Sequence, residues 1–397
     1  MVADLHAHYA MHLAPEDQPS TLELLGPDPR RLRRRDRVRA AVVGVLSRFA
    51  NYPTPDALPR VTLSTLQAGD VRLVFSVLYS PFDEMDLAQP YGAPPQPEYP
   101  ATLVRQLELV EADLREHHSG TAAVARGPAE LDGLLGSGRV VFVHSVEGGF
   151  QLGSTAEEVE RSVGTLAARG VTYVTLAHLF FRRVATNAPA IPFIPDWLYR
   201  LVFPQPREGL TELGRVAVRA MVERRLLIDV AHMGERALAD TFAELDRIDP
   251  GRTVPVVCTH AGCRFGRQEY NLSDETVRAI ARRDGVIGLI FANHQILDGL
   301  GRRRPRSLAD SVGVLARHID RIRALTGSHR HVGIGSDLDG FVKPTLPGLQ
   351  TMADMAPLEA ALTGRYGADD ARLICSENAL RPLRTYWLRG GPPKSVV

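Results

Sequence analysis

The feature that most restricts the fold is a series of eight apolar runs, each about as long as a β-strand. The runs are rich in Val, Ile and Leu and are continuous rather than alternating, which is typical of parallel strands buried on both faces. They occupy residues 2–6, 71–79, 140–144, 171–176, 227–231, 254–259, 286–290 and 332–336. Eight such strands, separated by helical segments, predict a (β/α)₈ TIM barrel.

The segments between the runs carry the signals of amphipathic helices. Apolar residues recur at helical spacing in 156–169, 212–225 and 273–283. Ser273 is placed to cap the last of these helices, and the acidic Asp274 suits its first turn. The chain has 397 residues, 44% of them hydrophobic, which suits one barrel of this kind. We therefore expect a single domain over residues 1–397.

Three stretches exceed a minimal barrel and are interpreted as insertions, at about 13–60, 81–100 and 187–209. The first contains an Arg-rich run at 30–39, which favours a solvated helix face over a phosphate or membrane contact. The second is rich in Pro and acidic residues and is expected to be a surface loop. The third has apolar residues between prolines, so it predicts either a lid or pocket wall, or an oligomer contact.

Composition excludes several classes of partner. The 47 basic and 46 acidic residues nearly balance, which argues against nucleic acid as the main partner. No apolar run reaches 18 residues, so we expect no membrane anchor. Residues 2–6 already look like a strand, which argues against a signal peptide. The three cysteines form no disulfide framework, so we expect a reducing, cytoplasmic location.

Residues that bind metals in proteins follow six of the eight runs. His6 and His8 end the first run, and positions i and i+2 of a strand share a face. The others are Glu147, His178, His232, His260 and Asp337. Barrels place their active sites at these carboxyl ends of strands, and imidazoles with carboxylates suit Zn²⁺ or a similar divalent ion. The alternative is that the histidines only cap strands by hydrogen bonding.

Seven short motifs carry a resemblance to a known family: DLHAH at 4–8, EGG at 147–149, LAH at 176–178, GLTELG at 209–214, IDVAH at 228–232, TH at 259–260 and GSDLDG at 335–340. In this order they resemble the membrane (renal) dipeptidase family, peptidase family M19, of the amidohydrolase superfamily. The match runs from residue 2 to about 388. It implies a barrel of the metal-dependent hydrolase type, with two divalent ions, Zn²⁺ first among the candidates.

The resemblance also implies roles for individual residues. By position, six residues would be metal ligands: His6, His8 and Asp337 at one ion, His232 and His260 at the other, and Glu147 bridging both. The ions would generate a hydroxide that attacks the amide of a small peptide-like substrate. Asp337 would carry the proton to the leaving amine, and His178 would contact the substrate and stabilise the oxyanion. Family members are commonly dimers, which implies a homodimer.

The scarcity of lysine supports the bridging role of Glu147. Many members of the superfamily bridge their two metals with a carboxylated lysine on the fourth strand. This chain has only Lys343 and Lys394, so that arrangement is not open to it. Glu147 is the one glutamate at the end of a predicted strand, and Gly148 after it permits a tight turn.

Two departures from the family pattern affect the expected chemistry. His8 stands where the family has Asp, so two divalent ions, two carboxylates and a hydroxide sum to a charge of +1 instead of zero. Tyr270, which precedes Asn271, stands where the family has an Arg that clamps the substrate carboxylate. A phenol cannot form that bidentate charged pair, although Arg264 or Arg267 could replace it. Tyr270 therefore argues against a preference for substrates with a free carboxylate.

The sequence favours a metal-dependent hydrolase that cleaves a dipeptide or a dipeptide-like amide. One alternative is a related enzyme that acts on another amide or ester, such as an N-acyl amino acid or a modified peptide. A second is a barrel that binds a ligand without catalysis. A third is a surface-binding role through the Arg-rich run at 30–39.

Overall fold

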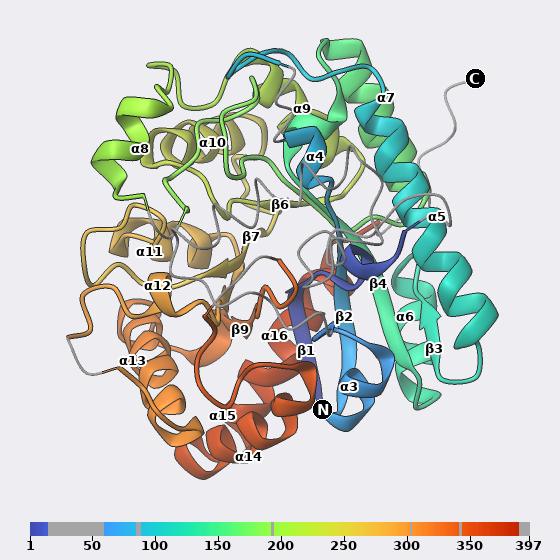
Figure 1. Ribbon diagram of the computed structural model, residues 1–397, viewed down its shortest axis with the longest axis vertical. Coiled ribbons are helices and arrows are strands. Elements are labelled where there is room, and N and C mark those ends of the chain that lie inside the picture. Colours follow the sequence, from blue (N-terminus) through green and yellow to red (C-terminus); the bar gives the residue numbers. More distant parts are fainter. Residues whose placement is uncertain (15–58, 85–88, 192–193, 302–303, 341–343, 389–397) are drawn as a thin grey trace, which may run out of the picture.

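The computed structural model describes residues 1–14, 59–84, 89–191, 194–301, 304–340 and 344–388. Within them the strands form a closed parallel barrel surrounded by helices (Figure 1). The barrel strands are β1 (Val2–Ala7), β2 (Val71–Leu78), β4 (Val140–Glu147), β5 (Tyr173–Thr175), β6 (Leu227–Asp229), β7 (Val256–Ala261), β8 (Val286–Leu289) and β9 (Val332–Ile334). The predicted (β/α)₈ fold is therefore confirmed.

The ring closes through parallel pairing of neighbours in the order β1-β2-β4-β5-β6-β7-β8-β9. Asp4 of β1 pairs with Ile334 of β9, which joins the first strand to the last. All eight predicted runs are strands of this ring. One further strand, β3 (Ala122–Val124), was not predicted; it pairs with the first residues of β4 outside the ring. Its three residues, Ala-Ala-Val, are too few to show a pattern.

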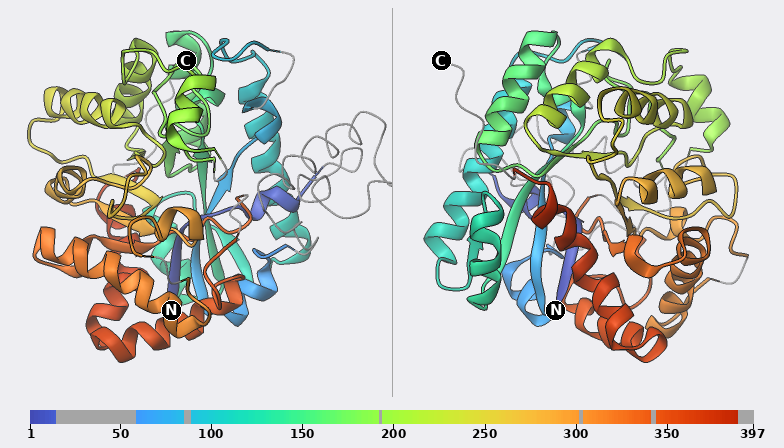
Figure 2. Two further views of the ribbon diagram at one scale, coloured as in Figure 1. Left: turned by 60° about the vertical axis from the view of Figure 1, so that its left-hand side comes forward. Right: turned by 180° about the vertical axis from the view of Figure 1, so that it is seen from behind.

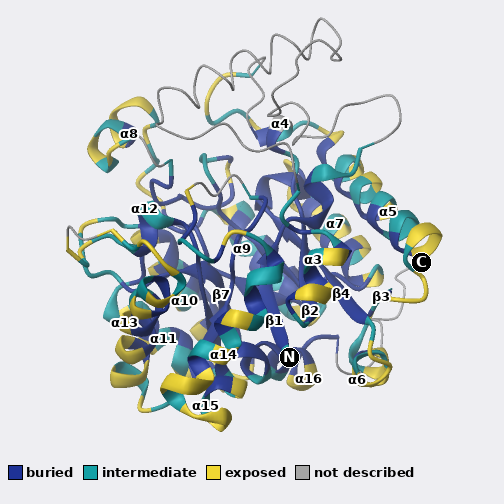
Figure 3. Ribbon diagram, turned by 60° about the horizontal axis from the view of Figure 1, so that its bottom comes forward, coloured by how far each residue is buried: buried dark blue, intermediate teal, exposed yellow. Residues whose placement is uncertain are grey.

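The helices cover the outside of the barrel, and the strands inside them are buried (Figure 3). They are α3 (Leu63–Ala68), α4 (Pro81–Glu84), α5 (Tyr99–His117), α6 (Pro128–Gly136), α7 (Ala156–Ala168), α8 (Asp196–Val202), α9 (Glu212–Glu223), α10 (Glu235–Ile248), α11 (Asp274–Arg282), α12 (Asn293–Ile296), α13 (Leu308–Thr326), α14 (Met355–Tyr366), α15 (Ala368–Arg372) and α16 (Asn378–Thr385). Ser273 caps α11 as expected, by accepting a hydrogen bond from Thr276 N at 3.2 Å. None of the helices in the described ranges has the length and apolar composition that crossing a bilayer requires.

The C-terminal helices α14 and α16 pack against the amino-terminal strand β1 (Figure 2). The amino group of Met1 lies 2.8 Å from Glu359 Oε2 on α14. The indole of Trp387 is fully buried and donates to the carbonyl of Val171, just before β5. These contacts tie the last turn of the chain to the amino ends of the strands, opposite the end that carries the predicted site.

The three predicted insertions have different outcomes. Most of 13–60, with the Arg-rich run at 30–39, lies outside the described residues. The segment 81–100 is not simply a surface loop, because α4 carries Glu84 into the interior with only 2% of it exposed. In 187–209, α8 holds Trp197, Leu201 and Val202 with 67%, 73% and 54% of their surface exposed. Their exposure fits both a lid and an oligomer contact, so the two interpretations stay predictions.

Candidate active site

The seven predicted site residues come together at the carboxyl ends of the strands, and all seven are buried. His6 and Glu147 belong to β1 and β4, and His260 to β7. His8 follows β1, whereas His178, His232 and Asp337 each stand three residues beyond the end of their strand. These side chains form three overlapping groups that could hold a metal: His6 with Glu147 and His260; His6 with His8 and Asp337; Glu147 with His178 and His232.

Glu147 lies at the centre of the group. Its Oε1 is 3.2 Å from His6 Nε2, 3.5 Å from His232 Nε2 and 3.4 Å from His260 Nε2. Its Oε2 is 3.5 Å from His8 Nε2 and 3.4 Å from His178 Nε2. One carboxylate therefore lies within 3.5 Å of imidazoles from both proposed ligand sets, His6 and His8 on one side and His232 and His260 on the other, as a bridging ligand must.

Asp337 completes the side of the site near β1. Its Oδ1 is 3.1 Å from His8 Nε2 and 3.9 Å from His6 Nε2. Its backbone is left-handed, with φ of 56°, and its N–H donates to the carbonyl of His6 at 2.9 Å. A Cβ at Gly340 would collide with Asp337 Oδ1 and lie 2.6 Å from His8 Nε2, so a larger residue there would displace these two side chains. His232 is likewise left-handed, with φ of 63°. Non-glycine residues in this region carry backbone strain that the surrounding structure must hold, and such residues cluster at functional sites.

Hydrogen bonds behind the site fix where two imidazoles carry their protons. Thr259 donates its hydroxyl proton to Asp229 Oδ2 at 2.8 Å, so its oxygen is left as an acceptor. That oxygen lies 3.1 Å from His6 Nδ1 and 3.0 Å from His260 Nδ1. Tyr173, whose hydroxyl donates to a backbone carbonyl, lies 3.0 Å from the same nitrogen of His6. Both Nδ1 atoms are therefore the donors, and both Nε2 atoms present lone pairs toward Glu147.

This donor set fits divalent metal ions. His6 Nε2 and Glu147 Oε1 are buried and have no hydrogen-bond partner within the described part of the chain. His232 Nε2 and His260 Nε2 face one another at 2.8 Å, as two nitrogens that share an ion can. Buried polar atoms are otherwise almost always paired, so this convergence indicates a bound cation.

The electrostatics of the site agree with that interpretation. Burial lowers the pKa of His8 and of His260, which keeps them in the neutral form that binds metal. Burial raises the pKa of Asp337 well above its ordinary value, and the negative charge of Glu147 acts in the same direction. Burial also opposes a charge on His178, but the carboxylates of Glu147 and Glu84 outweigh it and raise its pKa to about 9.

Glu84 is a site residue that the sequence analysis missed. Its Oε2 lies 2.6 Å from His178 Nδ1 and accepts from the hydroxyl of Tyr79 at 2.7 Å. No helical or strand pattern marks the Pro-rich segment around it, so its burial could not be read from periodicity. The only signal was its position, a few residues after the second strand, at the same end of the barrel as the other site residues.

Two of the residues predicted to bind the substrate, Tyr270 and Asn271, are buried, and their polar atoms already have hydrogen-bond partners. Tyr270 is buried beside His232, with ring centroids 5.0 Å apart, and its hydroxyl donates to the carbonyl of His260 at 2.9 Å. Asn271 instead braces its loop: its Oδ1 accepts from Gly262 N and its Nδ2 donates to a carbonyl.

Neither predicted replacement for the family's Arg is presented as a clamp. The guanidinium of Arg264 is occupied by Glu235 and by the carbonyls of Glu269 and Asn271. Arg267 is exposed. The structure therefore does not support Arg264 as the substrate clamp, because its donors are already used.

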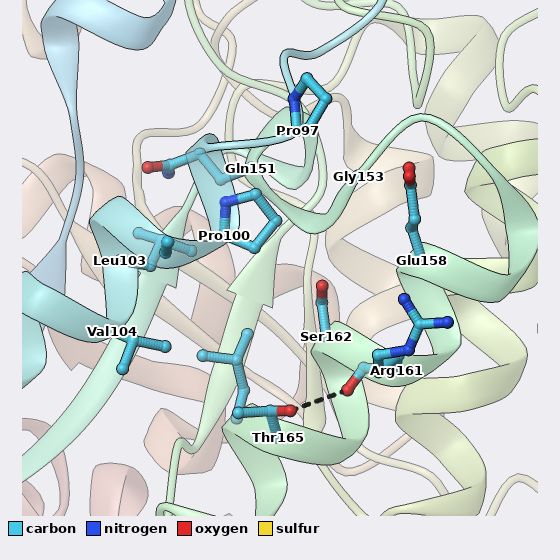
Figure 4. A pocket seen from close by; sticks show the side chains of 12 residues that line it. Pro97, Pro100, Leu103, Val104, Gln151, Gly153, Glu158, Arg161, Ser162 and Thr165 are labelled. Atoms are coloured by element: carbon cyan, nitrogen blue, oxygen red, sulfur yellow. Dashed lines mark hydrogen bonds between the residues drawn. The ribbon is translucent and has the colours of Figure 1, made fainter.

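A separate cavity of about 330 Å³ lies on the outer side of the barrel, between α5 and α7 (Figure 4). Its wall includes Pro97, Pro100, Arg161 and Thr165. It shares with the site only the neighbourhood of Gln151, whose Nε2 donates to the carbonyl of Glu147 at 2.6 Å. None of the predicted metal ligands lines this cavity, so the chemistry belongs to the barrel end.

The chain is similar in sequence to known proteins. The model of the membrane dipeptidase family, peptidase family M19, matches residues 47–387. An uncharacterised protein in the pqqA 5′ region of Klebsiella pneumoniae is 31% identical over 189 residues, which is 46% of this chain and 64% of that protein, just under two thirds of its length. The dipeptidase tcpJ of Claviceps purpurea is 24% identical over 340 residues, 84% of this chain and 70% of that one.

Two solved metallopeptidases have a fold similar to that of this chain. The dipeptidase AC, a metallopeptidase of family M19, has a TM-score of 0.69 at 21% identity, over 97% of this chain and 98% of its own. A metallopeptidase of Rhodobacter sphaeroides, solved with a phosphinate mimic of the dipeptide L-Ala-D-Ala, has a TM-score of 0.69 at 22% identity, over 97% and 99% of the two chains. At these identities the likeness supports the fold. With a family match over most of its length, the chain belongs to the membrane dipeptidase family, peptidase family M19, a family of metal-dependent hydrolases.

Proposed function

We propose that this protein is a metallohydrolase that cleaves a dipeptide or a dipeptide-like amide. The observation that carries the proposal is the convergence of buried imidazoles and carboxylates around Glu147, where His6 Nε2 and Glu147 Oε1 have no hydrogen-bond partner among the described residues. Hydrogen bonding that merely capped strands would pair these atoms instead. A barrel that only binds a ligand has no need of seven metal-competent side chains at one point.

Six residues would hold two divalent ions, with Zn²⁺ the first candidate because the donors are imidazoles and carboxylates. They are His6, His8 and Asp337 at one ion, His232 and His260 at the other, and Glu147 at both. When bound, the ions supply Lewis acidity and acidify a water to give the nucleophile.

The remaining steps belong to the side chains. Asp337 accepts the proton of the attacking water at a carboxylate oxygen and delivers it to the leaving amine. His178 directs Nε2 into the site and stabilises the oxygen on which charge develops. Tyr270 adds a buried ring and a hydroxyl that is already bonded, so it offers no charge to a substrate carboxylate. A neutral or blocked C-terminal group therefore suits this wall better than a free acid.

A substrate panel tests the proposal. The Zn²⁺-loaded protein is assayed with dipeptides that have L- or D-residues in the second position, with their C-terminal amides and with N-acyl amino acids, and its metal content is measured. We expect two ions per chain and hydrolysis of one of the dipeptide sets. Turnover of N-acyl amino acids alone would favour the related-amide alternative, and no turnover by fully loaded protein would favour a binding protein.

Two variants separate catalysis from folding. Asp337→Asn should lower kcat by about 100-fold or more, as loss of a general acid–base group does. Asp320→Asn, which removes an exposed carboxylate bonded to Tyr366 on the outer helices, should leave kcat unchanged. Metal content must be followed in both, because Asp337 is also a proposed ligand. A tenth or more of the wild-type rate at full occupancy in Asp337→Asn would contradict the role of Asp337.

We also propose a reducing, cytoplasmic location, supported by the three cysteines, which are all buried and unpaired. The homodimer implied by the family resemblance is proposed as well. Sedimentation of the purified protein measures its mass directly.

A further inference from the structure

Glu84 lies beside the catalytic group but outside the proposed metal ligands. It is the last residue of α4, six residues after the end of β2 at Leu78, and 2% of it is exposed. Its Oε1 accepts the backbone N–H of Phe180 at 2.9 Å. Its Oε2 accepts the hydroxyl of Tyr79 at 2.7 Å and lies 2.6 Å from His178 Nδ1. The carboxylate is thus enclosed by groups that can donate.

This arrangement determines which nitrogen of His178 faces the site. A carboxylate oxygen accepts hydrogen bonds, so the proton between Glu84 and His178 belongs to Nδ1. Nε2 then faces Glu147 Oε2, at 3.4 Å. The ring is also held on its faces and edges, with centroids 4.6 Å from the ring of Tyr79 and 4.5 Å from that of His232.

Glu84 is itself held firmly, which a positioning group requires. The guanidinium of Arg182 is 6% exposed and bonds to the carbonyl of Glu84. Tyr79 is fixed through its backbone by Gln106, which accepts from its N–H at 2.7 Å and donates to its carbonyl at 3.0 Å. The turn after β2 is therefore joined to the loop after β5 at three points: Phe180, Arg182 and His178.

We propose that Glu84 is a positioning residue for His178, whose Nδ1 it holds so that Nε2 is directed at the bound substrate. The proposal rests on the proposed amide hydrolysis, in which His178 stabilises developing charge. Glu84 does not touch the substrate or the ions, and it acts only through the imidazole. Loss of a partner that orients an imidazole typically lowers activity or metal affinity by about 10- to 100-fold.

Steady-state kinetics give the first test. Glu84→Gln keeps the shape of the side chain but replaces an acceptor oxygen by an amide, and we expect kcat to fall about 10- to 100-fold with KM and metal content little changed. The matched control is Asp249→Asn. Asp249 is also a buried carboxylate that accepts several hydrogen bonds, from Thr253, Val254 and Arg283, but it lies in the loop after α10.

Proton NMR gives a test that does not need turnover. An imidazole proton held by a carboxylate at 2.6 Å should give a low-field, slowly exchanging signal, which His178→Gln assigns by its loss. The signal should persist in Asp249→Asn and should be lost or shifted upfield in Glu84→Gln. If the wild type hydrolyses nothing, the proposed function fails, but this signal still decides the contact between Glu84 and His178.

Three results would overturn the proposal: an unchanged kcat in folded Glu84→Gln, an unchanged low-field signal, or a loss of metal in proportion to the loss of rate. The last would mean that Glu84 supports the ions and not the imidazole. Should Glu84→Gln fail to fold, Glu84→Asp keeps the charge and withdraws it by one methylene group. It is then expected to lower kcat and shift the signal in the same directions, and wild-type values of both would equally overturn the proposal.

Discussion

The hydroxyl oxygen of Thr259 accepts hydrogen bonds from two imidazoles of the site. Metal affinity should therefore depend on Thr259, although this residue is not itself a proposed metal ligand. Its hydroxyl oxygen lies between the Nδ1 atoms of His6 and His260, and the hydroxyl donates its hydrogen bond to Asp229. Asp229 in turn accepts two backbone N–H groups and two hydroxyls. Loss of the hydroxyl would leave the Nδ1 proton of His260 without this acceptor and that of His6 with Tyr173 alone, which would weaken the control of both tautomers.

We expect Thr259→Val, which has nearly the same shape, to weaken metal binding about 10- to 100-fold. Competition with a chelator of known affinity measures this. Thr259→Ser keeps the hydroxyl and should restore most of the affinity. Thr172→Val, at a buried hydroxyl bonded to the carbonyl of His144, is the control for burial. Equal affinity in the valine and wild-type proteins would show that Thr259 does not set the tautomers.

Tyr270 leads to a prediction about specificity. Its hydroxyl is bonded to the carbonyl of His260, so the site lacks the charged clamp that an Arg would supply there. A charged hydrogen bond contributes about 1.5–3 kcal/mol, or roughly a tenfold or greater change in affinity. Tyr270→Arg should therefore lower the ratio of kcat/KM for an amidated dipeptide to that for the free acid by about tenfold or more.

The matched variant Tyr270→Phe removes the hydroxyl without adding charge, and it should leave that ratio close to the wild-type value. Both variants must keep their metal, because the ring contacts His232. A folded, loaded Tyr270→Arg protein with an unchanged ratio would mean that another residue already binds the carboxylate.

At the scale of elements, the packing of α9 against α10 depends on one buried carboxylate. Glu244 of α10 is 4% exposed and accepts from Arg219 of α9 at 2.7 Å and from Arg247 at 2.6 Å. These hydrogen bonds, first that of Arg247 and then that of Arg219, lower the pKa of Glu244 to about 2. The guanidinium groups are partly exposed, so solvent screens part of the interaction.

The pH dependence follows from the direction of that shift. The folded pKa lies below the unfolded one, so the stabilisation is complete above about pH 4.5 and is lost as the pH falls toward 2. We expect Glu244→Gln to lower the free energy of unfolding by about 1–2 kcal/mol at pH 7, and by progressively less as the pH falls below 4.5. Urea unfolding of metal-free protein measures the difference.

Glu212→Gln is the control for this prediction, because Glu212 contacts the same Arg219 at 3.4 Å from an exposed position on α9. It should change the stability little at any pH. A difference between Glu244→Gln and wild type that is the same at pH 7 and pH 3 would mean that the effect is one of packing.

At the scale of the whole molecule, the sequence was sufficient to predict the ring of strands, because parallel strands that are buried on both faces appear as continuous apolar runs. It was also sufficient to predict that seven polar residues lie close together, because a barrel places the residues that follow its strands at one end. It could not reveal β3, which is three residues long, or the burial of Glu84 in a Pro-rich segment. It could not reveal that Arg264 is occupied by Glu235, because such pairing depends on which loops meet.

The closure of the ring has a consequence for how the protein matures. The site residues run from His6 to Asp337, and β1 meets β9 only when nearly the whole chain has been made. Contacts between such distant parts of a chain form late, so a partly synthesised or clipped chain offers an ion only fragments of its binding set. Ions that bind only the closed ring would stabilise it by mass action, so removal of metal is expected to weaken the closure between β1 and β9.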